Sequence, residues 1–416
     1  MPLYKECNQE FNILWCMPCN STRFKNDFDK WTSGNETIDK FIQNAQINAD
    51  WHMKLLAWIP YDRFKDIKQI AKGGFSTIYY AGWIDGYIKD WDIENQQWER
   101  SGRFEVVLKK FDGIRDLNED FLNEISIHLK SKDALSSINF FGITKDPKSR
   151  KYMMVLEYFK GGSLRYHLND NNIDWKMKLA YLSDLAFNFK EIHKLGIIHQ
   201  DLHPGNILSC NFNVFGVKIS DFGLSKLIGK NVENPQKKNI FGVLPYIAPE
   251  VLNGNDEYTK AADVYSFAII AYEIITGFQP YSDVPHDEEL ALKICNGLRP
   301  KIPFYTPKLI IRIIMRCWDA RVTHRPTFKE LKKELDKYSN NYEWNKNSEI
   351  TIQIDKAEEF SKNQEAANTT PLNYKTHPQA IYTSRLLNFS DLPKPKNEEN
   401  FEKELEKLSH DDIDEF

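Results

Sequence analysis

Two short polar segments constrain this 416-residue chain more than any other feature. The segment IIHQDLHPGNIL covers residues 197–208, and ISDFG follows at 219–223 after one predicted hairpin. The first segment places the carboxylate of Asp201 five residues before the carboxamide of Asn206, and the second places Asp221 at a glycine turn. Because Mg²⁺ prefers oxygen ligands, this set suits a site that handles nucleotide phosphate and Mg²⁺. Phosphoryl transfer also needs a base near the acceptor hydroxyl and cations around the phosphates.

A lysine and a glutamate nearer the N-terminus are candidates for the cationic part of such a site. The segment FEVVLKKF (104–111) predicts a strand with two adjacent lysines, and EDFLNEISIHLKSK (119–132) has helical spacing. A lysine on a buried strand needs a counter-charge, which Glu124 of the helix can supply. Since side chains alternate along a strand, Lys109 and Lys110 lie on opposite faces, and only one can face the site. The alternative is a surface lysine on an edge strand.

A glycine pair lies in the middle of FKDIKQIAKGGFSTIYYAGW (64–83). Apolar and polar residues alternate on both sides of it, which predicts a β-hairpin. Alone this loop is weak evidence for phosphate binding, because a glycine pair in any hairpin gives the same letters. Its position before the lysine strand makes it a candidate phosphate-binding loop.

Together these segments resemble the protein-kinase signature: a glycine-rich loop, a strand lysine, a helix glutamate, H-R-D-x-x-x-x-N, D-F-G and A-P-E, the last as YIAPE at 246–250. The resemblance covers about residues 64–337. CWDARVTHRPTF (317–328) resembles the tyrosine-kinase-like branch, and the whole chain looks like the kinase-like proteins expanded in arbuscular mycorrhizal fungi. The resemblance implies an α+β, bilobal protein kinase fold, with a small antiparallel β lobe plus one helix and a larger, mostly helical lobe.

The resemblance also implies a role for each polar residue. Lys109, where the family's strand motif ends, would align the α- and β-phosphates, with Glu124 as its partner. Asp201 would be the catalytic base for the acceptor hydroxyl, and Asn206 and Asp221 would be the metal ligands. The implied cofactors are ATP and Mg²⁺, and the implied partner is a protein substrate.

The nucleotide site implied by the resemblance differs in part from the family pattern G-x-G-x-x-G. Ala71 and Ser76 stand at its first and third glycines, while Gly73 keeps the second. Adenine would bind at the hinge, residues 157–159, behind Leu156 as gatekeeper. The predicted cofactor-binding residues are Ala71, Lys72, Gly73, Gly74, Phe75, Ser76, Ile78, Lys109, Leu156, Glu157, Phe159 and Asp221.

The loop sequence also departs from the family. Gln200 replaces the arginine of H-R-D, and a neutral amide cannot pair with an activation-loop phosphate. Ser225 and Tyr246 are the hydroxyl residues between D-F-G and A-P-E, so we predict a non-RD kinase without a mid-loop phosphorylation switch.

His203, counted with the catalytic residues, replaces a lysine that contacts the transferred phosphate, which predicts slower turnover. Val243 replaces a threonine typical of Ser/Thr kinases; branch resemblance favours Ser/Thr, and Tyr stays open.

Three further matches support the fold rather than the chemistry. Glu250 and Arg325 resemble a buried ion pair that ties down the substrate-side segment. Asp263 resembles the residue that holds the catalytic-loop backbone. His199 is expected to pack in the hydrophobic interior and orient that loop, not to act chemically.

Both flanks of the kinase-like region differ from it in composition. Cys7, Cys16 and Cys19 read C-x8-C-x2-C without a fourth ligand nearby, so packed thiols and a zinc site are both open. The last twenty residues hold nine Asp or Glu and two Lys. The predicted organisation is an N-terminal cysteine-containing and helical segment at 1–60, a kinase domain at 61–340 (small lobe about 61–158, large lobe about 159–340) and a mostly disordered, acidic-ended tail at 341–416.

Charge and hydropathy exclude several other classes. A net charge of −4 provides no general attraction to nucleic acid or to an anionic membrane. FAIIAYEII (267–275) is too short for a membrane span and contains Glu273, and MPLYKECNQEF lacks the apolar run of a secretory signal. Scattered cysteines predict a reducing compartment, cytoplasmic with the nucleus not excluded. The Trp-containing insertion at 85–103 and both termini are possible protein-docking surfaces, and a catalytically weak kinase-fold scaffold, or pseudokinase, is the alternative function.

Overall fold

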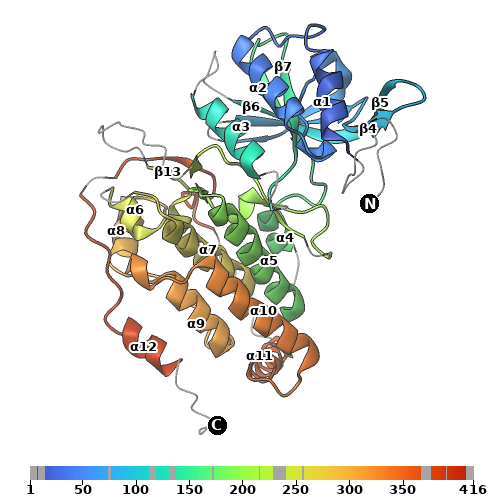
Figure 1. Cartoon of the computed structure of the whole chain (residues 1–416). Coiled ribbons are helices and arrows are strands. Elements are labelled where there is room, and N and C mark those ends of the chain that lie inside the picture. Colours follow the sequence, from blue (N-terminus) through green and yellow to red (C-terminus); the bar gives the residue numbers. More distant parts are fainter. Residues whose placement is uncertain are drawn as a thin grey trace. The chain divides into compact units, whose positions relative to one another are not determined.

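The computed structural model consists of two compact units, Met1–Phe159 and Lys160–Phe416, which we describe separately. A β-sheet dominates the first unit and helices dominate the second, which confirms the predicted α+β fold class (Figure 1). The structure describes residues 7, 15–73, 76–111, 119–131, 136–170, 173–214, 216–227, 240–254, 257–366, 376–389 and 391–408.

The first unit is built on a six-stranded sheet in the order β1-β7-β8-β6-β3-β2. Its strands are β1 (Ala57–Trp58), β2 (Phe64–Lys72), β3 (Ser76–Trp83), β6 (Phe104–Phe111), β7 (Phe140–Lys145) and β8 (Tyr152–Glu157), with helix α3 (Glu119–Ser131) alongside in sequence. Strands β7 and β8 are mostly apolar, and most of their residues are buried. β1 pairs with β7 in parallel, and the other neighbours are antiparallel. A Cβ at Gly142 would lie 2.0 Å from the Ala57 carbonyl oxygen, so only glycine permits β1 to join there.

The N-terminal residues belong to this same compact unit. They form the helices α1 (Met17–Lys25) and α2 (Glu36–Ile47). The side chain of Asn35 caps α2 by accepting hydrogen bonds from the amides of Thr37 and Ile38. The boundary predicted near residue 61 therefore marks a change of sequence pattern inside one compact unit.

The insertion at 85–103 is ordered as a hairpin of β4 (Ile88–Asp92) and β5 (Gln97–Arg100), not as a polar loop. Trp98 stacks on Phe24 of α1 with ring centroids 4.5 Å apart, and the Arg23 guanidinium lies 4.5 Å from the Trp91 ring centroid. These tryptophans thus pack against the chain's own N-terminal segment. This packing explains why the insertion contains tryptophans without requiring another protein to bind there.

The second unit is mainly helical. Its helices are α4 (Leu164–Asp170), α5 (Trp175–Lys194), α6 (Pro249–Leu252), α7 (Lys260–Thr276), α8 (Glu288–Cys295), α9 (Lys308–Cys317), α10 (Phe328–Trp344), α11 (Glu349–Ala366) and α12 (Phe401–Lys407). Helix α7 is buried along almost its whole length, because its sequence is mostly apolar, and its polar residues Asp263, Ser266 and Glu273 are buried with it. Helices α5 and α10 lie side by side, and Phe189 of α5 stacks on Phe328 at 5.1 Å (Figure 1). None of the helices that the structure describes combines the length and hydropathy that a membrane span requires.

Among its described residues the second unit also contains short strands: β9 (Ile197–Ile198), β10 (Ile207–Leu208), β11 (Lys218–Ile219), β12 (Lys226–Leu227), β13 (Ile240–Gly242) and β14 (Arg385–Leu387). They form three antiparallel pairs, β10–β11, β9–β12 and β13–β14. The first two pairs join segments that are close in sequence. The third joins the segment before A-P-E to the C-terminal tail.

The tail after residue 341 contains more structure than its polar composition predicts. Besides β14, it contributes helices α11 and α12. A sparse set of apolar side chains is buried there: Ile350, Ile354, Ala357, Leu387, Leu392 and Phe401. Ile350, Ile354 and Ala357 recur at helical spacing within α11, and average composition does not reveal such a pattern.

Candidate active site

The lysine and glutamate of the first unit form a buried ion pair. The Lys109 Nζ lies 2.6 Å from the Glu124 Oε1, and the two residues are 4% and 0% exposed. Lys110, on the opposite face of β6, donates to the Tyr79 hydroxyl at 2.9 Å. The alternation of the strand therefore gives the two neighbouring lysines different partners, and Lys109 is the one that meets the helix glutamate. Burial makes each charge depend on the other.

The other residues of this unit that were predicted to bind the nucleotide lie on or beside the sheet, where the structure describes them. Ile78 of β3 is directly opposite Lys109 of β6, and the Gly73 amide donates to the Ser76 carbonyl at 2.8 Å across the hairpin turn. Leu156 is buried in β8. The Glu157 carboxylate accepts a hydrogen bond from the side-chain Nδ2 of Asn139 at 2.6 Å. Of the remaining predicted residues, Ala71 and Lys72 end β2, Phe159 is buried, and Gly74 and Phe75 lie outside the described residues.

The loop that carries Asp201 is held by a buried carboxylate at the start of α7. The two oxygens of Asp263 accept the backbone amides of His199 and Gln200 at 3.0 and 3.1 Å. The Oδ2 of Asp263, which accepts the His199 amide, also lies 2.8 Å from the His193 Nε2. Gln200 has a positive φ of 69°, a strained conformation for a residue with a side chain. This confirms the predicted contact of Asp263 with the backbone of the loop that carries Asp201.

Asp201 and Asn206 are close neighbours within this loop. The Asn206 side-chain nitrogen donates to the Asp201 carbonyl at 2.9 Å and lies 3.5 Å from its carboxylate. With the nitrogen used in this way, the amide oxygen is the atom of Asn206 that could ligate a cation. The two residues are buried, at 7% and 8% exposure. Their relative position is set by the hydrogen bond within the loop.

Asp221 is tied to the Asn206 segment through the β10–β11 pair. The amide and the hydroxyl of Ser220 both donate to the Asn206 carbonyl, at 2.9 and 3.0 Å. The His199 Nε2 lies 3.0 Å from the Ser220 carbonyl, which agrees with an orienting role for this histidine. Asp221 has a positive φ of 59°, and its carboxylate accepts the Gly223 amide at 3.3 Å. The two candidate metal ligands therefore flank one small hairpin.

His203 is buried beside the candidate base. Its Nδ1 accepts the Gly205 amide at 3.1 Å, and its Nε2 lies 3.8 Å from the Asp201 Oδ2. A Cβ at Gly205 would come within 2.7 Å of the imidazole, so this turn requires glycine. Burial, helped by the nearby Arg165 guanidinium, lowers the pKa of His203 from 6.5 to about 3. The imidazole is therefore neutral at pH 7. The prediction of slower turnover assumed this neutral form, because His203 stands where the family has a charged lysine.

The buried imidazole predicts a measurable pH dependence of stability. The unfolded state takes up a proton near pH 6.5 and the folded state near pH 3, so stability is fully present above pH 6.5 and falls as the pH drops below it. Between pH 7 and pH 5, His203 should lower the free energy of unfolding by about 2 kcal/mol. We expect His203→Gln to reduce the pH dependence of chemical unfolding by this amount. The exposed-site variant His324→Gln should leave that dependence unchanged, and equal slopes for both variants would contradict the prediction.

The second unit also contains the buried ion pairs Arg325–Glu250 and Arg165–Glu273. Arg325 binds Glu250 with both guanidinium nitrogens, at 2.6 and 2.7 Å, which confirms the predicted pair. Glu273, which the sequence placed within an apolar helix, lies 3.5 Å from the Arg165 guanidinium. Tyr246 donates its hydroxyl to Glu273 and accepts a hydrogen bond from Arg165 at 2.8 Å. Sequence reasoning missed Arg165, because its partner lies more than one hundred residues away.

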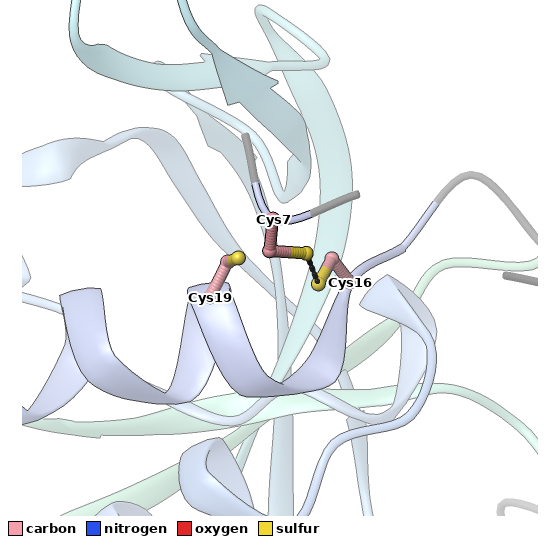
Figure 2. A group of neighbouring side chains, drawn as sticks. All are labelled: Cys7, Cys16 and Cys19. Atoms are coloured by element: carbon pink, nitrogen blue, oxygen red, sulfur yellow. Dashed lines mark hydrogen bonds between the residues drawn. The ribbon is translucent and has the colours of Figure 1, made fainter. Parts of the chain in front are cut away.

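A cysteine cluster forms in the N-terminal segment (Figure 2). The sulfur atoms of Cys7, Cys16 and Cys19 all lie within 4.8 Å of one another, and those of Cys7 and Cys16 are 3.5 Å apart. Burial and the two neighbouring thiols raise the pKa of Cys19 to about 12. The cluster has three of the four ligands of tetrahedral zinc, so both interpretations from the sequence, zinc and packed thiols, fit its geometry.

The fold of the two units, the Lys109–Glu124 pair and the Asp201 loop define the protein-kinase class. Residues 64–335 match the family of protein tyrosine and serine/threonine kinases, and the chain belongs to this family.

The relatives are kinases from distant organisms. A probable serine/threonine-protein kinase of Dictyostelium discoideum, drkC, is 34% identical over 238 residues, which cover 56% of this chain and 31% of drkC. The serine/threonine-protein kinase VIK of Arabidopsis thaliana is 30% identical over 284 residues, covering 66% and 60% of the two chains. A human protein, ankyrin repeat and protein kinase domain-containing protein 1, is 29% identical over 285 residues, covering 65% and 34%. The matched region thus spans less than two thirds of each of these relatives.

Proposed function

We propose that this chain is an ATP-dependent protein kinase that transfers the γ-phosphate of Mg·ATP to a protein hydroxyl, preferably Ser or Thr, in intracellular signalling. The strongest support is the Asp201 loop. Asp263 accepts two backbone amides of this loop, and the buried Asp201 lies next to Asn206. The preference for Ser or Thr is supported by the names of the relatives. The proposal places the chain in the tyrosine-kinase-like branch and in the cytoplasm, with the nucleus open.

In this proposal each residue has one task. Asp201 accepts the proton of the acceptor hydroxyl, whose oxygen attacks the γ-phosphorus while the bond to ADP breaks. Lys109, positioned by Glu124, binds the α- and β-phosphates. Asn206 and Asp221 would hold the metal, and their oxygen donors fit a hard cation such as Mg²⁺. When bound, Mg²⁺ would neutralise the charge that develops on the phosphates.

Two features suggest a slower and differently regulated kinase. The neutral His203 can donate one hydrogen bond to a phosphate oxygen but brings no positive charge. Gln200 donates its backbone amide to Asp263 and has no guanidinium for a loop phosphate. We therefore propose basal activity without mid-loop phosphorylation, and residues 228–239 of that loop lie outside the described part of the chain.

The experiment that tests this function is Mg²⁺-dependent transfer of ³²P from ATP to a general protein substrate by the full chain. Phosphoamino-acid analysis of the product should give phosphoserine or phosphothreonine, and phosphotyrosine would correct the acceptor class. The matched inactive control is Asp201→Asn. If the wild type transfers no more phosphate than this control, the result would instead support the alternative function, a catalytically weak kinase-fold scaffold. Its protein-docking surfaces would then be the insertion at 85–103 and the two termini.

A further inference from the structure

We propose that Ser384 in the C-terminal tail is this chain's own phosphoacceptor, which Asp201 activates within the same molecule. The Ser384 hydroxyl donates a hydrogen bond to the Asp201 Oδ2. This is the contact that an acceptor hydroxyl must make with a general base before transfer. The inference rests on the proposed kinase function, since it takes Asp201 as the base and Mg·ATP as the phosphate donor.

A strand pair fixes the register of the tail beside the base. Arg385, which follows Ser384 directly, is paired with Gly242, and Leu387 with Ile240. Gly242 itself lies against the catalytic loop, because a Cβ there would be 3.4 Å from the Asp201 Oδ1. The β13–β14 pair therefore presents Ser384 to Asp201 through backbone hydrogen bonds, as strand addition presents an extended peptide.

Contacts before Ser384 hold the same segment from the N-terminal side. The His286 amide donates to the Gln379 carbonyl at 3.0 Å, and the Ile381 amide donates to the His286 Nδ1 at 3.1 Å. The Tyr382 hydroxyl donates to the Pro280 carbonyl at 2.8 Å, and its ring centroid lies 4.9 Å from the Arg165 guanidinium.

Contacts after Ser384 hold the segment on its other side. The Lys396 amide donates to the Cys295 carbonyl at 3.0 Å. Asn397 donates to Asp319 and accepts from the Ala320 amide, both at 2.8 Å. The tail is thus anchored on both sides, and the position of Ser384 follows from many contacts rather than from one hydrogen bond.

The proposed step is balanced without any further reactant. The Ser384 Oγ forms a bond to the γ-phosphorus of ATP, the bond from that phosphorus to the β,γ-bridging oxygen breaks, and ADP leaves. Asp201 takes the hydroxyl proton and passes it to solvent or to a phosphate oxygen. The product carries close to two negative charges beside the Asp201 carboxylate. Like charges at this separation repel strongly, so phosphorylation should detach β14 and open the acceptor site to other proteins.

The test uses the full-length chain, first treated with phosphatase and then incubated with Mg·ATP at several protein concentrations. Mass spectrometry of the tryptic peptide 376–385 should place one phosphate on Ser384, formed at a rate independent of protein concentration. Hydrogen exchange at Arg385–Leu387 should rise on phosphorylation, and transfer to an added protein substrate should increase at least about tenfold. Ser384→Ala should block all three changes, whereas Thr383→Val, one residue away, should block none.

The outcomes separate this inference from the kinase function. Phosphate on an added substrate but none on Ser384 would overturn the inference and leave the function intact, with the tail as a fixed blocking segment. A rate that rises with protein concentration would also overturn it, since transfer would then occur between molecules. No transfer to either acceptor by the wild type would overturn both.

Discussion

Asp201→Asn is expected to lower kcat for phosphate transfer by about 10²–10⁴-fold, the usual contribution of a positioned general base. The amide has the shape of the carboxylate and can keep the neighbouring hydrogen bonds, but it cannot take the proton of the acceptor. The KM for ATP should change little, because the proposed phosphate and metal contacts belong to other residues. The measurement is the initial rate of ³²P transfer to an added protein under saturating Mg·ATP.

A matched control for this variant exists in the same unit. Asp184 is a partly buried aspartate whose carboxylate accepts the Gly216 backbone amide at 3.1 Å, and it has no role in the proposed site. Asp184→Asn should keep the wild-type rate within about twofold. Thermal unfolding of both variants would show that the fold is retained. Equal rates for wild type and Asp201→Asn would remove Asp201 from the mechanism.

The local arrangement of the candidate site was predictable because it depends on short-range geometry. The D-x-x-x-x-N spacing places Asp201 and Asn206 in one tight loop, and their contact at 2.9 Å follows from that loop alone. The choice between Lys109 and Lys110 required only strand alternation and one buried glutamate. The residue roles remain predictions, since they require a bound nucleotide and an acceptor.

Long-range pairings were not predictable from local pattern. The segment around β14 has no strong strand signal, and β14 forms only because β13 offers an edge far away in sequence. Trp91 and Trp98 suggested an exposed docking surface, since nothing local indicates that α1 and Trp15 would lie against the hairpin. Average polarity likewise suggested disorder for the tail, although single residues such as Phe401 are buried. In each case the structure of the segment depends on a distant part of the same chain that packs against it, not on the segment's own sequence.

Arg325→Met is expected to lower the free energy of unfolding of the second unit by about 3–5 kcal/mol, the range for breaking a buried ion pair from one side. The substitution would leave the Glu250 carboxylate, only 3% exposed, without its cation. It would also remove the donors that reach the carbonyls of Asp319 at 2.8 Å and Ala261 at 2.9 Å. Urea denaturation, followed by a probe in the second unit, would measure the loss.

A surface pair in the same unit separates burial from charge pairing as the cause. Lys293 and Glu289 are also 2.6 Å apart, but their side chains are 56% and 71% exposed. Lys293→Met should therefore cost no more than about 1 kcal/mol. The double variant Glu250→Gln with Arg325→Met should regain part of the loss, because it no longer buries an unpaired charge. Equal losses for Arg325→Met and Lys293→Met would show that the buried pair does not anchor the segment that follows A-P-E.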